Sequence, residues 1–250
     1  RFIAQRKERV MNRNTLIYEV QDLKKVYDKR NVLQIGRLQV HKGTIYGIVG
    51  PVGSGKTSLL KQLSGLEKPT EGKLLYDESE FKTSLLGKVK SPDEIKYISL
   101  TDSRSNERVS RYFSSHHGKR SEEIRKQYFN KGFRRFMWEQ NITSLSQGEL
   151  TWIKLVDAVE SDPRVLIIDN YGSMLDDEME QDISRRLRRM NRNLGTTIIL
   201  STTNTRRIQK LVSVMIFLDK GHVAKIRSGS QHKESKQRHG RQQQRRRNRN

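Results

Sequence analysis

The eight residues 50–57, GPVGSGKT, have the types and spacing of a loop that binds phosphate groups. Its glycines can adopt backbone angles that turn successive N–H groups inward, and they let an anion approach the main chain closely. Lys56 can contact the outer phosphates, and the Thr57 hydroxyl can ligate Mg²⁺. We therefore predict that the chain binds ATP or a closely related nucleoside triphosphate. The predicted binding residues in this segment are Gly50, Gly53, Ser54, Gly55, Lys56, Thr57 and Ser58.

An acidic residue follows the apolar run 165–168, VLII. Asp169 comes directly after this run, and a carboxylate at the end of a buried strand can hold Mg²⁺ beside a phosphate loop. Many strands end in aspartate, so the position carries weight only together with the motifs around it. We predict that Thr57 and Asp169 form the Mg²⁺ site.

The elements around the loop alternate between strand and helix patterns. The phosphate loop lies between a β-branched run, TIYGIVG, and a helix pattern at 58–66 whose apolar face is Leu59, Leu60, Leu63 and Leu66. Further helices are predicted near 149–159 and 177–194, the second one ending at Gly195. Apolar strand patterns are predicted at 16–20, 33–40, 94–100, 164–170, 196–201, 212–219 and 222–227. This alternation predicts a parallel sheet with helices on both faces.

Charge and composition divide the 250 residues into three parts. The formal charge is +22, and much of it lies in residues 1–14 and in residues 227–250, which hold nine Lys or Arg and one Glu. We expect a basic segment at 1–14, a folded domain at 15–227 and a disordered basic tail at 228–250. The tail suits a polyanion such as RNA or an anionic lipid surface, or it is simply a solvated segment.

The absence of cysteine excludes a disulfide scaffold and a thiol nucleophile. The longest apolar runs are also short, and none approaches the roughly 18 residues that cross a bilayer. We expect a cytoplasmic protein, bound peripherally to the inner face of a membrane.

Residues 145–149, LSQGE, resemble the LSGGQ signature of ABC-type ATPases. The resemblance runs from Leu16 to Arg227. It includes Tyr27 at the place of the adenine-stacking aromatic, the SMLD segment at 173–176 and the stretch LEKPTEGKLLYD after the first helix. It implies an α/β P-loop NTPase of ABC type. Such a fold has a mixed sheet core with helices on both faces, an antiparallel β part and a small helical subdomain, here at about 101–150.

The resemblance also implies that two such domains face each other around two ATP molecules. The signature residues would then serve the ATP of a second domain, in a homodimer or a heterodimer, and Asp176 would link the two sites. These signature residues are Ser146, Gln147, Gly148 and Glu149.

Three positions depart from the family pattern. Asn170 replaces the glutamate after the magnesium aspartate, Thr203 replaces the switch histidine, and Leu100 replaces the glutamine before the helical subdomain. An amide cannot accept a proton from water, and losing a positioned general base costs about 10²- to 10⁴-fold in rate. We therefore expect no intact catalytic set and weak or absent hydrolysis.

The region 101–140 combines basic residues with aromatic ones, and two interpretations stay open for it. Basic residues among aromatics suit RNA, through phosphate contacts and base stacking. The same pattern is typical of an amphipathic helical subdomain that packs its own aromatics. His116 and His117 have no carboxylate or cysteine cluster at ligand spacing, so we predict no metal site there.

Three functions fit these observations. The first is an ATP-binding subunit that acts on a separate membrane protein, itself a weak hydrolase or the degenerate half of a pair. The second is a non-transport ABC protein that binds RNA or the ribosome under ATP control. The third is a structural or regulatory subunit with ATP as a constitutive ligand.

Overall fold

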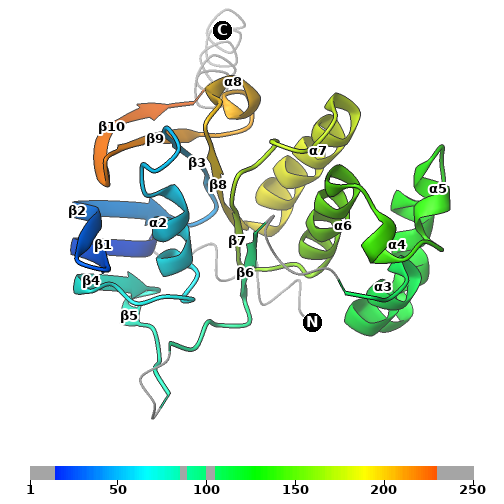
Figure 1. Ribbon diagram of the computed structural model, residues 1–250, viewed down its shortest axis with the longest axis horizontal. Helices are drawn as coiled ribbons and strands as arrows, with labels where there is room; N and C mark the ends of the chain where they lie inside the picture. Colours follow the sequence, from blue (N-terminus) through cyan, green and yellow to red (C-terminus); the bar gives the residue numbers. More distant parts are fainter. Residues whose placement is uncertain (1–14, 85–88, 100–104, 230–250) are drawn as a thin grey trace, which may run out of the picture.

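The computed structural model describes residues 15–84, 89–99 and 105–229, in two β-sheets and a set of helices (Figure 1). Residues 1–14, Leu100 and the basic tail from 230 lie outside this described part. The first sheet is antiparallel, in the order β2-β1-β4-β5. Its strands are β1 (Leu16–Tyr27), β2 (Arg30–His41), β4 (Glu71–Tyr76) and β5 (Ser79–Glu80).

The second sheet holds the strand that leads into the phosphate loop. Its order is β10-β9-β3-β8-β7-β6; neighbouring strands from β9 to β6 run parallel, and β10 pairs antiparallel with β9. The strands are β3 (Ile45–Val49), β6 (Ile95–Ile98), β7 (Val165–Ile168), β8 (Thr197–Thr202), β9 (Val214–Asp219) and β10 (His222–Ser228). The predicted mixed sheet is confirmed.

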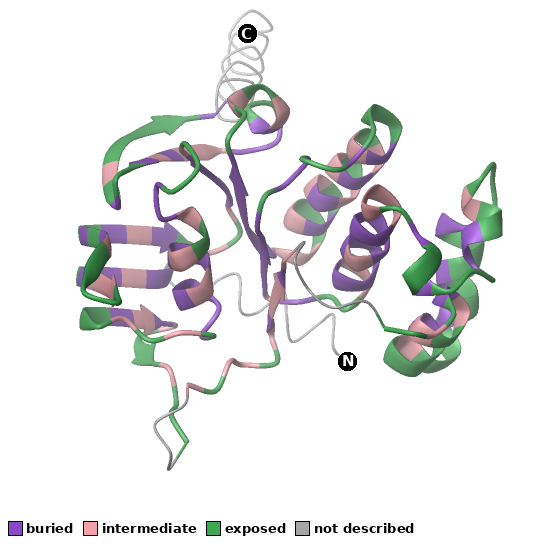
Figure 2. Cartoon of the chain, viewed as in Figure 1, coloured by how far each residue is buried: buried purple, intermediate pink, exposed green. Residues whose placement is uncertain are grey.

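Alternate residues of this sheet enter two separate apolar cores. Ile45 and Val49 pack with helices α6 (Gln147–Glu160) and α7 (Asp177–Leu194) on one face. Tyr46 and Ile48 pack on the other face with α2 (Lys56–Leu63) and with the antiparallel sheet. The sheet lies between α2 on one side and α6 and α7 on the other (Figure 1), and its strands β3, β7 and β8 are buried (Figure 2). Because side chains alternate along a strand, one continuous apolar run builds both cores.

The ends of the helices follow from particular residues. Asp176 caps α7 by accepting a 2.7 Å hydrogen bond from the Met179 N–H, and Gly195 ends it in the left-handed conformation (φ 69°). Helix α2 ends at Leu63, and the chain reverses at Gly65 (φ 71°). The Gly65 N–H bonds the Gln62 carbonyl, and the Leu66 N–H bonds the Lys61 carbonyl. This pair of bonds is a Schellman motif.

The Schellman motif corrects one sequence-based prediction. It ends α2 before Leu66, so this residue leaves the apolar face that we expected it to join and is 51% exposed. Leu59, Leu60 and Leu63 are buried as predicted. The short elements β4, β5 and α8 (Thr205–Ile208) were not predicted, because they lack a periodic apolar pattern long enough to stand out.

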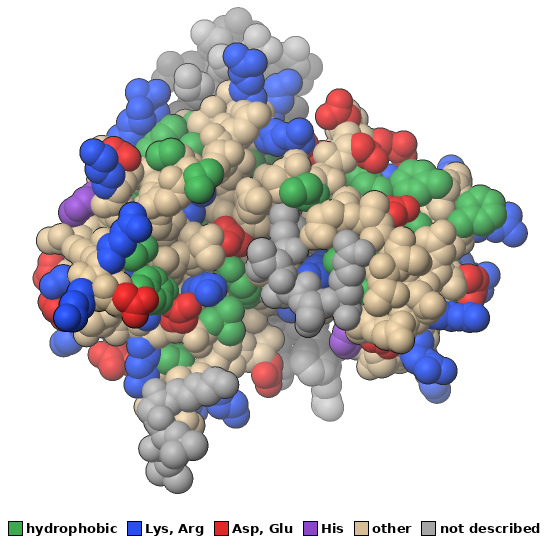
Figure 3. Space-filling view, viewed as in Figure 1, with side chains coloured by type: hydrophobic (Ala, Val, Ile, Leu, Met, Phe, Trp, Pro, Cys, Tyr) green, Lys and Arg blue, Asp and Glu red, His purple; other side chains and the backbone are tan. Residues whose placement is uncertain are grey.

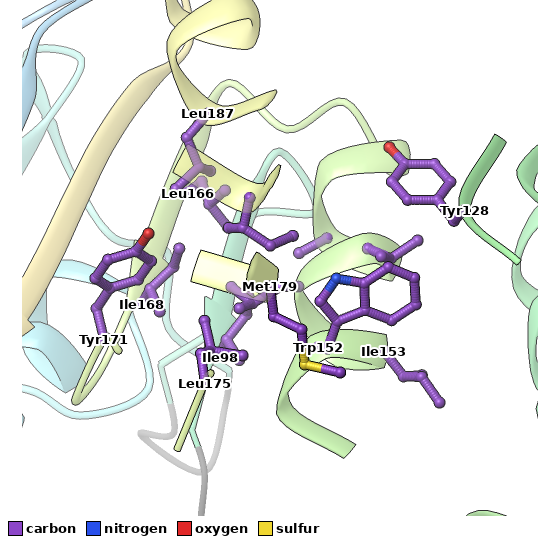
Figure 4. Packing of buried hydrophobic residues seen from close by; sticks show 14 of the residues in the cluster. Ile98, Tyr128, Trp152, Ile153, Leu166, Ile168, Tyr171, Leu175, Met179 and Leu187 are labelled. Carbon is purple, nitrogen blue, oxygen red and sulfur yellow. The ribbon is translucent and has the colours of Figure 1, made fainter. Parts of the chain in front are cut away.

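The helical subdomain comprises α3 (Val109–His117), η1 (Gly118–Arg120), α4 (Ser121–Tyr128), α5 (Arg134–Met137) and η2 (Ile142–Ser144). Its aromatic side chains largely pack inside. The ring of Phe113 stacks on Trp138 with centroids 5.8 Å apart, and Phe129 meets Trp152 of α6 edge-on at 5.2 Å. Figure 4 shows Trp152 in this core. The self-packing interpretation of the region therefore holds for most of these aromatics.

Two aromatics of the subdomain are exposed, Phe133 (46%) and Phe136 (71%). Lys and Arg side chains are spread over most of the face in Figure 3, from the β10 and α8 end to the helical subdomain. Within the described residues, no helix has both the length and the apolar character needed to cross a membrane.

Candidate nucleotide-binding site

The phosphate loop connects β3 to α2, the strand–loop–helix context that its motif requires. Gly53 (φ 79°) and Gly55 (φ 97°) have left-handed backbones, which only glycine adopts without strain. Gly50 is needed for a different reason. A Cβ at this position would lie 2.3 Å from the Leu218 carbonyl oxygen and 2.5 Å from the Ser54 hydroxyl. Each glycine thus meets a steric demand of the loop.

Lys56, the first residue of α2, turns its ammonium back into the loop. It donates hydrogen bonds to the carbonyl oxygens of Gly50 (2.9 Å) and Pro51 (2.7 Å). Burial lowers the pKa of Lys56, and the negative charge of Asp169 acts in the opposite direction. The ammonium and the N-terminus of α2 therefore put positive charge where a phosphate would enter.

Asp169 joins three elements at one edge of the six-stranded sheet. Its Oδ2 accepts a 2.7 Å hydrogen bond from the Thr57 hydroxyl and a 3.4 Å bond from the Tyr97 hydroxyl, and its Oδ1 accepts one from Ser201. Asp169 as a whole residue is 7% exposed. Thr57 and Asp169 are thus brought together as predicted.

This oxygen donor set fits Mg²⁺. Magnesium is held by one or two carboxylates together with substrate phosphates and water, and not by a cage of protein ligands. In the part of the chain that the structure describes, no group of three or more His, Cys, Asp or Glu side chains could hold a metal ion. Mg²⁺ at this site would neutralise phosphate charge, while Thr57 and Asp169 would orient it.

Tyr97 and Ser201 were not predicted as partners of Asp169. A topological signal could have found them, because the carboxyl ends of parallel strands meet at one edge. The pairing places Ile168 opposite Leu200 and Val49 opposite Thr202. The residues that end β3, β7 and β8 are therefore neighbours, although they are far apart in the sequence.

Asn170 is exposed and left-handed (φ 56°), and its N–H donates a 2.8 Å hydrogen bond to the Ser201 hydroxyl. Asparagine tolerates this conformation better than glutamate does, so the backbone gives a physical reason for its presence. Thr203 follows the end of β8 and is exposed. Leu100, the third departure, lies outside the described residues.

Tyr27 lies at the end of β1, and the residue is 36% exposed. Its hydroxyl donates a hydrogen bond to Glu67, and it also interacts with the Ser58 side chain at the start of α2. The structure therefore places the predicted stacking residue beside the helix that carries Lys56 and Thr57.

The signature residues lie at the N-terminus of α6. The Ser146 hydroxyl accepts a bond from the Glu149 N–H, and the Glu149 carboxylate accepts a 2.8 Å bond from the Ser146 N–H, which forms a capping box. A Cβ at Gly148 would lie 2.6 Å from the Met174 carbonyl oxygen. Since α2 and α6 pack on opposite faces of the sheet, the signature and the loop's helix are not brought together within one chain.

The two histidines of α3 do meet a carboxylate. The His117 Nε2 lies 2.9 Å from Asp157 of α6, and the His116 Nδ1 lies 3.6 Å from it. Asp157 also pairs with Lys96 at 3.0 Å. His117 and Asp157 are 40 positions apart, so residue spacing in the sequence did not indicate this cluster.

Comparison with known proteins places this geometry in a family. A family model described as ABC transporter matches residues 33–171. The chain is 25% identical over 217 residues to the spermidine/putrescine import ATP-binding protein PotA of Bacillus cereus. The match covers 84% of this chain and 65% of PotA, so the chain spans less than two thirds of that relative.

Two solved structures share the fold. One is cbiO1 from Clostridium perfringens, described as part of the ABC transporter complex cbiONQ, with a TM-score of 0.69 and 21% identity over 89% of this chain and 92% of cbiO1. The other is a dimeric ATP-binding cassette, MJ0796, bound to ADP and Pi, with a TM-score of 0.69 and 19% identity over 84% of this chain and 98% of that one. Because the family model covers more than half of the chain, the protein belongs to the ABC transporter family, and its folded part is an ABC-type nucleotide-binding domain.

Proposed function

We propose that this chain is the ATP-binding subunit of an ABC-type complex, which holds MgATP firmly and hydrolyses it weakly or not at all. The contact between Thr57 and Asp169 carries the proposal, because it joins the two Mg²⁺-binding side chains beside Lys56. The next residue, Asn170, offers a neutral amide where a general base would be needed. The site thus has the side chains needed to bind MgATP, but the side chain at position 170 cannot accept a proton from water.

The proposal includes a second nucleotide-binding domain. The capped N-terminus of α6 and helix α2 lie on opposite faces of the sheet. Ser146 and Gly148 would therefore reach the ATP of a partner domain, in a homodimer or a heterodimer. The solved structure of the similar cassette MJ0796 with ADP and Pi is dimeric, which supports this step.

The proposal also includes a separate membrane subunit, with this chain bound peripherally at the cytoplasmic side. This step is supported by two similar proteins. PotA is described as an import ATP-binding protein, and cbiO1 is described as part of a transporter complex. An RNA or lipid partner of the basic tail stays a prediction, because the tail from 230 lies outside the described residues.

The test compares nucleotide binding with hydrolysis in the purified protein. We expect MgATP to bind, by isothermal titration calorimetry, and phosphate release to be far below that of an ABC ATPase with an intact glutamate. Lys56→Ala should abolish binding, while Lys73→Ala, which removes an exposed lysine of β4, should not change it. Binding retained in Lys56→Ala would refute the site, and ordinary turnover by the wild-type protein would refute the claim of weak hydrolysis.

A further inference from the structure

A tight hairpin sets the backbone position of Tyr27. Tyr27 pairs with Arg30 across a two-residue turn, in which Asp28 (φ 45°) and Lys29 (φ 65°) are both left-handed. Such type I′ turns match the twist of the flanking strands and set their register. The turn therefore sets the backbone position of Tyr27 at the end of β1.

The segment after the C-terminal end of α2 sets the backbone position of Glu67. The Schellman motif at Gly65 reverses the chain, and the following segment is tied to β1 by hydrogen bonds, one of them from the Lys25 ammonium to the Lys68 carbonyl (2.8 Å). The Thr70 N–H bonds the Lys24 carbonyl at 2.8 Å, and the Val26 N–H bonds the Thr70 hydroxyl at 3.0 Å. The helix that follows the phosphate loop thus holds Glu67 against the tip of the hairpin.

The two side chains meet in a charged cluster. The Tyr27 hydroxyl donates to Oε2 of Glu67, and the Glu67 carboxylate also pairs with Lys61 (3.1 Å) and Lys25 (3.4 Å). The Lys25 ammonium lies 4.9 Å from the centre of the Tyr27 ring. The ring is thus held by its hydroxyl and flanked by a cation, while part of its surface stays exposed.

Both groups keep this arrangement at neutral pH. Burial, followed by the hydrogen bond to Glu67, raises the pKa of Tyr27 to about 12. Burial alone would raise the pKa of Glu67, but the hydrogen bonds from Tyr27 and Lys61 and the charges of Lys61 and Lys25 together lower it. The tyrosine therefore keeps its proton, and the glutamate keeps its charge.

We propose that Glu67 is a positioning residue for the nucleotide base, because it clamps the Tyr27 ring in one orientation next to the phosphate loop. The inference rests on the proposed function, since it needs a nucleotide with its phosphates at Lys56. An aromatic face stacks on any base, and a ring fixed beforehand loses less freedom when the base arrives. The clamp therefore favours a nucleoside triphosphate over a triphosphate that has no base.

The experiment measures the affinities for MgATP and for magnesium tripolyphosphate by isothermal titration calorimetry. Glu67→Ala should weaken MgATP binding about tenfold and leave tripolyphosphate binding unchanged. Tyr27→Ala should lose at least as much affinity for MgATP. The double variant should lose no more affinity than Tyr27→Ala does, because Glu67 acts through the ring. Glu67→Gln should restore most of the affinity, since its amide oxygen can accept the tyrosine hydrogen bond.

The matched control is Glu71→Ala, which removes an exposed glutamate of β4 that pairs with Lys24 of β1. It should bind both ligands as the wild type does. Thermal melting checks that each variant folds.

Two results would overturn the role of Glu67 without bearing on the proposed function. One is an equal loss of affinity for both ligands in Glu67→Ala. The other is full MgATP affinity in Glu67→Ala while Tyr27→Ala binds MgATP more weakly than the wild type. A wild-type protein that binds neither ligand would refute the proposed function as well.

Discussion

Thr57 and Asp169 are separated by 112 positions, and a 2.7 Å hydrogen bond joins their side chains. Thr57 is the second residue of the helix that follows the phosphate loop, and Asp169 follows the last residue of β7, which is separated from β3 by β8. The pair therefore couples the loop to the centre of the parallel sheet. The same two oxygens are the ones that Mg²⁺ would share with a bound nucleotide.

Thr57→Ala should reduce the affinity for MgATP roughly ten- to hundredfold, because it removes a hydroxyl next to a buried carboxylate. Thr57→Ser keeps the hydroxyl and should bind almost as the wild type does. Titration of ATP with Mg²⁺ and with EDTA measures the difference. We expect the loss in Thr57→Ala to be confined to the magnesium form; an equal loss in EDTA would contradict the assignment.

Asn170→Glu should raise ATP hydrolysis by about 10²-fold or more, because it supplies a carboxylate that can accept a proton from water. Asn170→Gln has the same side-chain length without the charge, and it has the same difficulty with the left-handed backbone at φ 56°. Phosphate release under saturating MgATP measures the gain. If both variants hydrolyse ATP equally slowly, Asn170 is not what limits the reaction.

The sequence predicted the parts of the site that a short motif carries. The loop at 50–57 and Asp169 each follow an apolar run, and both lie where the motif places them. Residues that act across the sheet were missed, since Tyr97 and Ser201 reach Asp169 only through strand order. Strand order is a long-range property that no local pattern encodes.

The ends of the helices likewise include one that a local pattern predicts and one that it does not. Gly195 ends α7 as predicted, because a left-handed glycine after a run of helix-forming residues is a local signal. Leu66 was wrongly placed on the face of α2, because its spacing fits a helix and the reversal at Gly65 is stabilised by backbone bonds. Periodicity therefore predicts the apolar face better than it predicts where a helix stops.

Asp157→Asn should loosen helix α3 from the core. The buried carboxylate contacts Lys96 of β6 and both histidines of α3, so its removal should lower the free energy of unfolding by about 1–3 kcal/mol. Hydrogen exchange of residues 109–117 should accelerate by a similar free energy. Glu123→Gln, which removes an exposed carboxylate on α4, is the control; unchanged exchange in Asp157→Asn would contradict the role of the cluster.

The same cluster predicts a pH dependence. Burial would raise the pKa of Asp157, but Lys96 and the two histidines lower it below its ordinary value of 3.8. A lowered pKa means that the carboxylate stabilises the fold above about pH 3.8 and loses this effect as the pH falls through the folded-state pKa. The stability difference between the wild-type protein and Asp157→Asn should therefore shrink as the pH falls below about pH 4 in urea unfolding.

Gly148→Ala tests whether helix α6, which carries the signature residues at its N-terminus, packs against the segment before α7. Alanine favours a helix over glycine by about 1 kcal/mol, so propensity alone predicts a more stable protein. A Cβ at this position would lie 2.6 Å from the backbone oxygen of Met174, which cannot swing away as the end of a side chain could. We therefore expect a loss of about 1–3 kcal/mol in urea unfolding. Gly36→Ala, whose Cβ would lie 3.9 Å from the Asp22 carboxylate, should be neutral or slightly stabilising. Equal stability of the two variants would show that α6 and the segment before α7 are not in fixed contact.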